Sequence, residues 1–196
     1  MSTPATAGRA TGRATTSRPA SEPDSARPAL TGGVLLGVGL GGLFDGIVLH
    51  QLLQWHHMLT DHGDYADRFP PGTVTDLQDN TLADGLFHVA AVVFTVVGMV
   101  LLYRAARRGW TLTVPTLIGA LLAGWGLFNI VEGLVDHHLL SVHHVRDDVA
   151  DPLWWDVGFL ALGVALVVVG LLLVRSGATL RSRNGRVDRE GRTARP

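Results

Sequence analysis

The sequence predicts an all-α integral membrane protein, a four-helix bundle built from two tandem helical-hairpin repeats. Three observations support this fold class: four apolar windows of membrane-spanning length, an uneven distribution of arginine, and an internal repeat rich in histidine. A chain of 196 residues is long enough for one compact unit. The absence of Cys excludes disulfides, thiolate metal sites and a Cys nucleophile.

Four windows are long and apolar enough to cross a bilayer, which takes about 20 residues. Gly is frequent in all four, and those at 39, 41 and 42 lack the strand context of a nucleotide-binding turn, so we interpret them as helix-packing residues. The spans cover residues 33–54, 82–103, 112–135 and 153–174, within a membrane domain over 31–175.

Two tails flank this domain. Residues 1–30 and the Arg-rich residues 176–196 lack apolar periodicity, so we expect both tails to be disordered. Their Arg side chains suit anionic lipid headgroups. No nucleic-acid-binding motif accompanies them, so no nucleic-acid partner is inferred.

The net charge of −1 is a cancellation between two regions. Residues 1–30, 104–108 and 175–196 hold 14 of the 16 Arg against four acidic residues, whereas the rest of the chain holds two Arg against 13 acidic residues and all nine His. The positive-inside rule therefore places both termini and the loop at 104–108 in the cytoplasm. The acidic, His-rich region then lies towards the outer face.

An internal repeat joins the two halves of the chain. Residues 45–57 (DGIVLHQLLQWHH) and 132–144 (EGLVDHHLLSVHH) are identical at seven of 13 positions at an offset of 87. A weaker alignment at an offset of 72 pairs Asp84 with Asp156. We interpret the two hairpins as parallel repeats related by a pseudo-twofold axis along the membrane normal.

Helical spacing predicts which polar side chains converge. At 100° per residue, His50, Gln54 and His57 share one face of the first span, and the repeat places His137, Ser141 and His144 in the same way if the third span stays helical that far. Asp84 and His88 lie one turn apart on the second span, which suits either shared ligation or a carboxylate that orients an imidazole.

Clusters of imidazole and carboxylate suit Zn, Cu(II), Fe or Mn, so the sequence predicts a transition-metal site near the outer surface. The hypothesis does not include His56, His62, His138 and His143, which we interpret as solvated loop residues. The candidate ligands and supporting residues are His50, His57, His88, His137, His144, Glu132, Asp136, Asp84 and Asp45.

Three function classes stay open. The first is a metal protein, either an enzyme in which Glu132 or Asp136 serves as base for metal-activated water or a metal-handling factor. The second is a haem protein with axial His ligands from two helices. The third is a proton-coupled carrier that uses His/Asp relays. Four spans make a small path, so the carrier requires a homo-oligomer.

Three His-rich strings resemble a bacterial family of predicted membrane proteins, domain of unknown function 2243. They are LFDGIVLHQxLQWHHM (43–58), LADGLFH (82–88) and FNxVEGxxDHHLLxxHHVR (128–146). The resemblance covers residues 31–175 and implies a four-span protein of the bacterial plasma membrane. It implies no activity.

Overall fold

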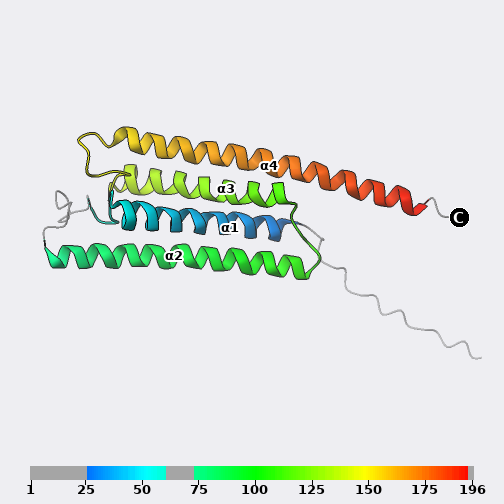
Figure 1. Cartoon of the computed structure of the whole chain (residues 1–196), viewed down its shortest axis with the longest axis horizontal. Coiled ribbons are helices and arrows are strands. Elements are labelled where there is room, and N and C mark those ends of the chain that lie inside the picture. Colours follow the sequence, from blue (N-terminus) through cyan, green and yellow to red (C-terminus); the bar gives the residue numbers. More distant parts are fainter. Residues whose placement is uncertain (1–25, 61–72, 194–196) are drawn as a thin grey trace, which may run out of the picture.

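The computed structural model describes residues 26–60 and 73–193, with side chains up to residue 177. Four long helices lie side by side in these residues and no strand occurs among them, which confirms the all-α class (Figure 1). The elements are α1 (Arg27–Phe44), η1 (Asp45–Leu53), α2 (Val74–Arg107), α3 (Val114–Glu132), η3 (Gly133–Leu139) and α4 (Leu153–Thr193). The π-helical segments η1 and η3 continue α1 and α3 directly.

All four helices, with their π-helical continuations, are long and apolar enough to cross a membrane. In Figure 1, α1 and α3 form the middle of the bundle and α2 and α4 flank them. Large apolar side chains on the outer helices are exposed, such as Val93 at 54% and Leu172 at 58%. Such a surface suits lipid contact rather than water. The segments after η1 and η3 lie together at one end of the bundle, opposite the α2–α3 connection (Figure 1).

Helix ends differ from the predicted windows at two places. The second span is predicted to begin at residue 82, but α2 begins at Val74 because Thr73 and Asp76 form a reciprocal capping box. The fourth span is predicted to end at residue 174, with a disordered tail after it, whereas α4 continues to Thr193. No Pro interrupts this stretch, and Arg favours helix. Residues 1–25, which make up most of the predicted N-tail, and His62 lie outside the described residues.

Glycines set the close approach of the two central helices. A Cβ added at Gly37 would meet the Leu121 backbone, and one added at Gly124 would meet the Val34 backbone. The contact is reciprocal, so α1 and α3 pack backbone to backbone. This arrangement agrees with the interpretation of the span glycines as small residues that let helices approach.

We expect Gly124→Ala to destabilise the bundle, because its methyl group would overlap the Val34 carbonyl oxygen and push α1 away from α3. Overpacking of this kind costs about 1–3 kcal/mol. The matched control is Gly85→Ala, where a Cβ meets nothing within 4 Å. Thermal unfolding in detergent should show a lower Tm for Gly124→Ala and an unchanged or higher Tm for Gly85→Ala. Equal Tm values would contradict this packing.

Candidate metal centre

The polar residues gather where the two central helices end. Both α1 and α3 change from α-helix to π-helix over their last turns, and π-helical turns are frequent at functional sites. Each π-helix is followed by a residue with left-handed backbone: Gln54 with φ 50° and Ser141 with φ 49°. Neither is Gly, so both turns carry strain. The turns lead the following His pairs back across the end of the bundle.

The helix therefore ends before the third member of each predicted stripe. His57 and His144 follow the left-handed turns and lie on loops, so a 100° periodicity does not apply to them. They nevertheless reach the same neighbourhood as His50 and His137, because each pair contacts one buried carboxylate.

Asp84 on α2 is the first of these carboxylates and is 1% exposed. Its oxygens accept from His50 Nδ1 at 2.9 Å and from His57 Nδ1 at 2.7 Å. The Met58 N–H also donates to Asp84 Oδ1 at 3.0 Å. A carboxylate only accepts, so both Nδ1 atoms carry a hydrogen and both Nε2 atoms are on the side of the ring away from Asp84.

Asp156 on α4 has the same role in the other half of the site. It accepts from His144 Nδ1 at 2.6 Å and from the Val145 N–H at 2.9 Å. His137 Nδ1 lies 3.4 Å from Asp156 Oδ1. The carboxylate is 1% exposed, so the interactions are shielded from solvent.

His56 and His143 lie at the centre of the site. They are 1% and 0% exposed, and their rings stack with centroids 4.5 Å apart and planes 4° apart. His56 Nδ1 donates to the Val145 carbonyl at 2.9 Å, which leaves His56 Nε2 as an acceptor. Burial, reinforced by neighbouring His residues, lowers the pKa of both imidazoles well below 6.5. Both are therefore neutral at pH 7, which is the form that binds metals.

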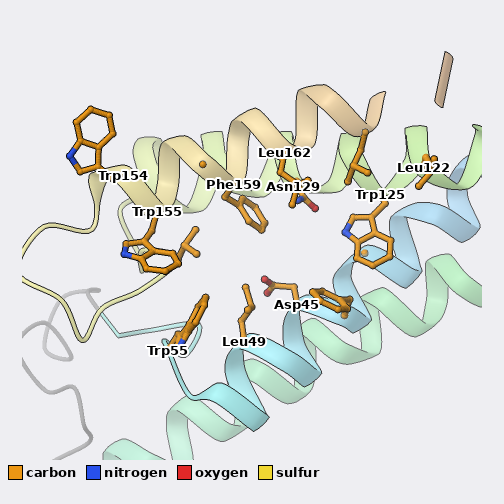
Figure 2. Close-up of a pocket in the computed structure, with 15 residues that line it drawn as sticks. Asp45, Leu49, Trp55, Leu122, Trp125, Asn129, Trp154, Trp155, Phe159 and Leu162 are labelled. Atoms are coloured by element: carbon orange, nitrogen blue, oxygen red, sulfur yellow. The ribbon is translucent and has the colours of Figure 1, made fainter. Parts of the chain in front are cut away.

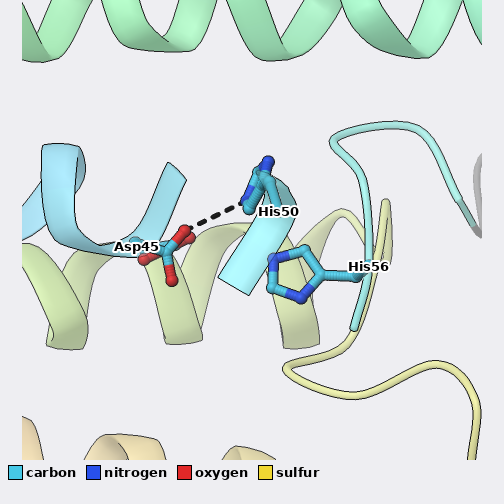
Figure 3. A group of neighbouring side chains, drawn as sticks. Asp45, His50 and His56 are labelled. Atoms are coloured by element: carbon cyan, nitrogen blue, oxygen red, sulfur yellow. Dashed lines mark ion pairs between the residues drawn. The ribbon is translucent and has the colours of Figure 1, made fainter. Parts of the chain in front are cut away.

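Two groups at this centre could hold a metal ion, each with candidate ligand atoms within 4.8 Å of one another. The first contains Asp45, His50, His56 and Glu132, and the second contains Glu132, His137 and His143. Every member is buried, and Glu132 belongs to both groups. Figure 3 shows Asp45, His50 and His56 turned towards one another, with His50 Nε2 3.0 Å from Asp45 Oδ2.

The inner atoms of these groups lack hydrogen-bond partners among the described residues. This is so for His50 Nε2, His56 Nε2 and Asp45 Oδ2, and for both Glu132 carboxylate oxygens. His50 Nε2 and Asp45 Oδ2 nevertheless lie close enough for an ion pair. The centre is thus a set of buried nitrogen and oxygen atoms that face one another and have unfilled hydrogen-bonding capacity.

The structure distributes the predicted site residues over three environments. Four lie in the two inner groups: Asp45, His50, Glu132 and His137. Three others form the surrounding carboxylate–imidazole pairs: Asp84, His57 and His144. His88 and Asp136 belong to neither set. His88 Nδ1 donates to the Asp84 main-chain carbonyl at 2.7 Å, and its ring lies against Gly46.

The interpretation of His56 and His143 as solvated loop residues is wrong, because both are buried and both join an inner group. They do lie on loops, but the left-handed turns fold those loops inwards. The offset of 87 aligns His56 with His143, and this pairing of two His residues is the feature of the sequence that could have identified them as site residues. His138, the other described member of that set, is exposed.

The carboxylate–imidazole contacts of the first half of the chain recur in the second half at the sequence offsets of 72 and 87 residues. Asp84 contacts His50 and His57 as Asp156 contacts His137 and His144. The two glycine contacts of the central helices follow the same rule, since Gly37 and Gly124 are 87 residues apart.

The family model described as "Predicted membrane protein (DUF2243)" matches residues 32–177, which cover all four apolar helices and the site. Comparison with curated proteins and with solved structures gives no match.

Proposed function

Because the chain belongs to the predicted membrane protein family DUF2243, we propose that it is a multi-pass membrane protein that holds a transition-metal ion between η1, η3 and the loops that follow them. Its ligands come from Asp45, His50, His56 and Glu132, with His137 and His143 as the related set. The ion is the structural and chemical centre of the protein.

The observation that carries this proposal is the cluster of buried nitrogen and oxygen atoms without hydrogen-bond partners among the described residues. His50 Nε2 and Asp45 Oδ2, for example, lie 3.0 Å apart in a buried site. Each buried polar atom without a partner costs about 1–3 kcal/mol. A metal ion bound between neutral imidazoles and carboxylates would give a partner to five such inner atoms.

The outer carboxylates support the same proposal. Metal-binding imidazoles commonly donate their second nitrogen to a carboxylate or carbonyl, which fixes the ring and raises its basicity. Asp84 accepts the hydrogen bond from His50 Nδ1, and the Val145 carbonyl accepts the one from His56 Nδ1. Both rings are thereby held with Nε2 towards the centre.

The ligand types narrow the metal to a class. Imidazole nitrogen with carboxylate oxygen suits Zn, Cu(II), Fe or Mn. The haem alternative has less support, because a macrocycle must fit between axial imidazoles and these rings contact one another directly. The His50 and His56 centroids, for example, are 4.3 Å apart. A proton relay would use the same nitrogen and oxygen atoms as the metal site. A measurement of bound metal distinguishes the proton relay from the metal site.

The sidedness of the site follows from the charge distribution. The site lies at the bundle end opposite the α2–α3 connection, which follows Arg107 at the end of α2 and begins with Arg108. We propose that this connection and both termini face the cytoplasm and that the metal centre lies near the outer surface. In a bacterium, this membrane is the plasma membrane.

We also propose that α1–α2 and α3–α4 are two copies of one hairpin, related by an axis along the membrane normal. The paired sequences at offsets of 87 and 72, the two π-helices and the matched Asp84 and Asp156 contacts support it. Under this proposal, Asp45 and Glu132 are equivalent ligands that meet at the axis.

Elemental analysis tests the metal proposal. Full-length protein purified in detergent should retain transition metal, and His56→Ala should lose most of it because an inner ligand is removed. His138→Ala is the matched control, since this exposed imidazole lies outside both groups. Equal metal content in wild type and His56→Ala, or none in wild type after growth with supplied Zn, Mn, Fe and Cu, would refute the proposal.

A further inference from the structure

A cavity of about 510 Å³ lies beside the metal centre, between α1 and α4. Its walls are largely aromatic and aliphatic, and its volume falls within the range of small-molecule sites, about 300–1,000 Å³. Phe44 and Trp125 meet there with ring centroids 5.0 Å apart, and Trp55 and Trp155 meet at 5.1 Å. Figure 2 shows Trp55, Trp125 and Trp155 around the space.

Two polar side chains line this apolar cavity: Asp45 and Asn129. Each residue is only 2% exposed, and Asn129 Oδ1 and Asp45 Oδ2 have no hydrogen-bond partner among the described residues. Asp45 is also a member of the inner metal group. An unpartnered amide oxygen in an apolar wall requires a donor, and a bound molecule can supply it.

The cavity opens on the flank of the bundle. Phe44 and Leu162 line it and are 47% and 52% exposed. Both belong to helices that are apolar enough to span a membrane. A ligand would therefore enter from the lipid, which requires a molecule with an apolar body.

The Trp and Asn residues of this cavity are not repeated at the equivalent positions of the chain. At the offsets of 87 and 72, Trp125 corresponds to Val38 and Asn129 to Gly42, while Trp154 and Trp155 correspond to Leu82 and Ala83. The aromatic walls and the amide therefore belong to one side of the site only. This difference suits a single asymmetric ligand next to an otherwise repeated centre.

We propose that the cavity binds a long-chain molecule with a neutral hydroxyl head, the chain lying among the aromatic rings and the hydroxyl donating to Asn129 Oδ1. The carboxylate of Asp45 disfavours an anionic head at the same depth. The cavity and its unpartnered amide carry this inference. The position of the hydroxyl beside a metal ion rests on the proposed function.

Quenching of tryptophan fluorescence by 11-bromo-1-undecanol tests the inference, since Trp55, Trp125 and Trp155 line the cavity. The full-length protein in nanodiscs should show a saturable component. We expect 11-bromoundecanoic acid at pH 9, where its head is ionised, and 1-bromoundecane, which has no head, to bind several-fold to about tenfold more weakly. A single hydrogen bond is worth up to about that factor.

Two variants make the test specific. Gly158→Leu should abolish the saturable component, because Gly158 lines the cavity and a Cβ there meets nothing within 4 Å. A Cβ at Gly85 also meets nothing within 4 Å, and Gly85 does not line the cavity. The control variant Gly85→Leu should therefore retain the saturable component. Asn129→Leu should weaken the alcohol about tenfold and leave 1-bromoundecane unchanged.

Metal content measured on the same samples separates the two proposals. Bound metal without saturable quenching by the alcohol would overturn the ligand inference and leave the metal centre standing. Saturable quenching that Gly158→Leu abolishes, in protein without metal, would overturn the proposed function and leave the ligand inference standing. Saturable quenching that survives Gly158→Leu, or tighter binding of the acid, would also overturn the inference.

Discussion

Replacing Glu132 by Gln is expected to release the metal and lower the Tm of the full-length protein. The Glu132 carboxylate belongs to both inner groups and is 4% exposed, with both oxygens unpartnered in the described structure. Gln has the same shape but lacks the negative charge and one of the two acceptor oxygens. We expect metal affinity to fall by more than about 100-fold, beyond the 10–100-fold typical of residues that only orient ligands.

The direction of the Tm change distinguishes the metal centre from a metal-free polar cluster. Without a cation, a buried carboxylate beside Asp45 is repelled and desolvated, and the neutral amide would raise Tm. With a cation, the amide removes a ligand and Tm falls. Asp136→Asn is the matched control, because this neighbouring carboxylate belongs to neither group and the variant should keep its metal. An increase in Tm for Glu132→Gln with unchanged metal content would contradict the assignment.

Replacing Asp84 by Asn is expected to weaken metal binding about 10–100-fold, although Asp84 does not belong to either inner group. Asp84 accepts from His50, His57 and the Met58 N–H. The amide of Asn would direct N–H groups at an imidazole N–H, so His50 would lose its fixed orientation. Hydrogen bonds to a charged group are worth about 1.5–3 kcal/mol, so stability should fall by about 2 kcal/mol or more.

Competition with a chromophoric chelator measures this affinity, and thermal unfolding in detergent measures the stability. Asp148→Asn is the control carboxylate, because Asp148 pairs with Arg146 at the surface, where ion pairs contribute little. A variant at Asp84 with wild-type affinity would show that the outer carboxylates do not orient the ligands.

Much of the fold follows from simple patterns in the chain. Long apolar windows mark the helices because a bilayer requires about 20 apolar residues for each span. The repeat also pointed to His50 and His137, since matched His residues in two similar segments are hard to explain as packing. The capping box at Thr73 and Asp76 marks the start of α2 in the sequence, eight residues before the apolar window at 82–103.

The inner ligands were harder to predict because they depend on how the central helices end. A spacing of 3.6 residues per turn selects His57 and His144, but η1 and η3 are π-helical and the left-handed residues Gln54 and Ser141 reverse the chain. The first His of each pair, His56 or His143, then points inwards and the second contacts a carboxylate. Nothing in the local sequence requires a non-glycine residue to adopt that conformation.

The cavity illustrates a second limit of sequence reasoning. Trp125 and Asn129 lie one turn apart on α3, so their common face was predictable. Their partners on α4, Trp155 and Phe159, come into place only through the packing of α3 against α4. Whether an apolar stripe is filled or hollow depends on side chains from a distant helix.

X-ray absorption at the edge of the bound metal, on full-length protein purified in detergent, is the decisive measurement for the metal centre. We expect a first shell of nitrogen and oxygen only, at about 2.0–2.2 Å if the metal is zinc, with the multiple-scattering pattern of at least two imidazoles. His56→Ala should lower the imidazole number or remove the signal. A shell of water oxygens without imidazole, or no metal edge above that of the buffer, would contradict the proposed metal centre.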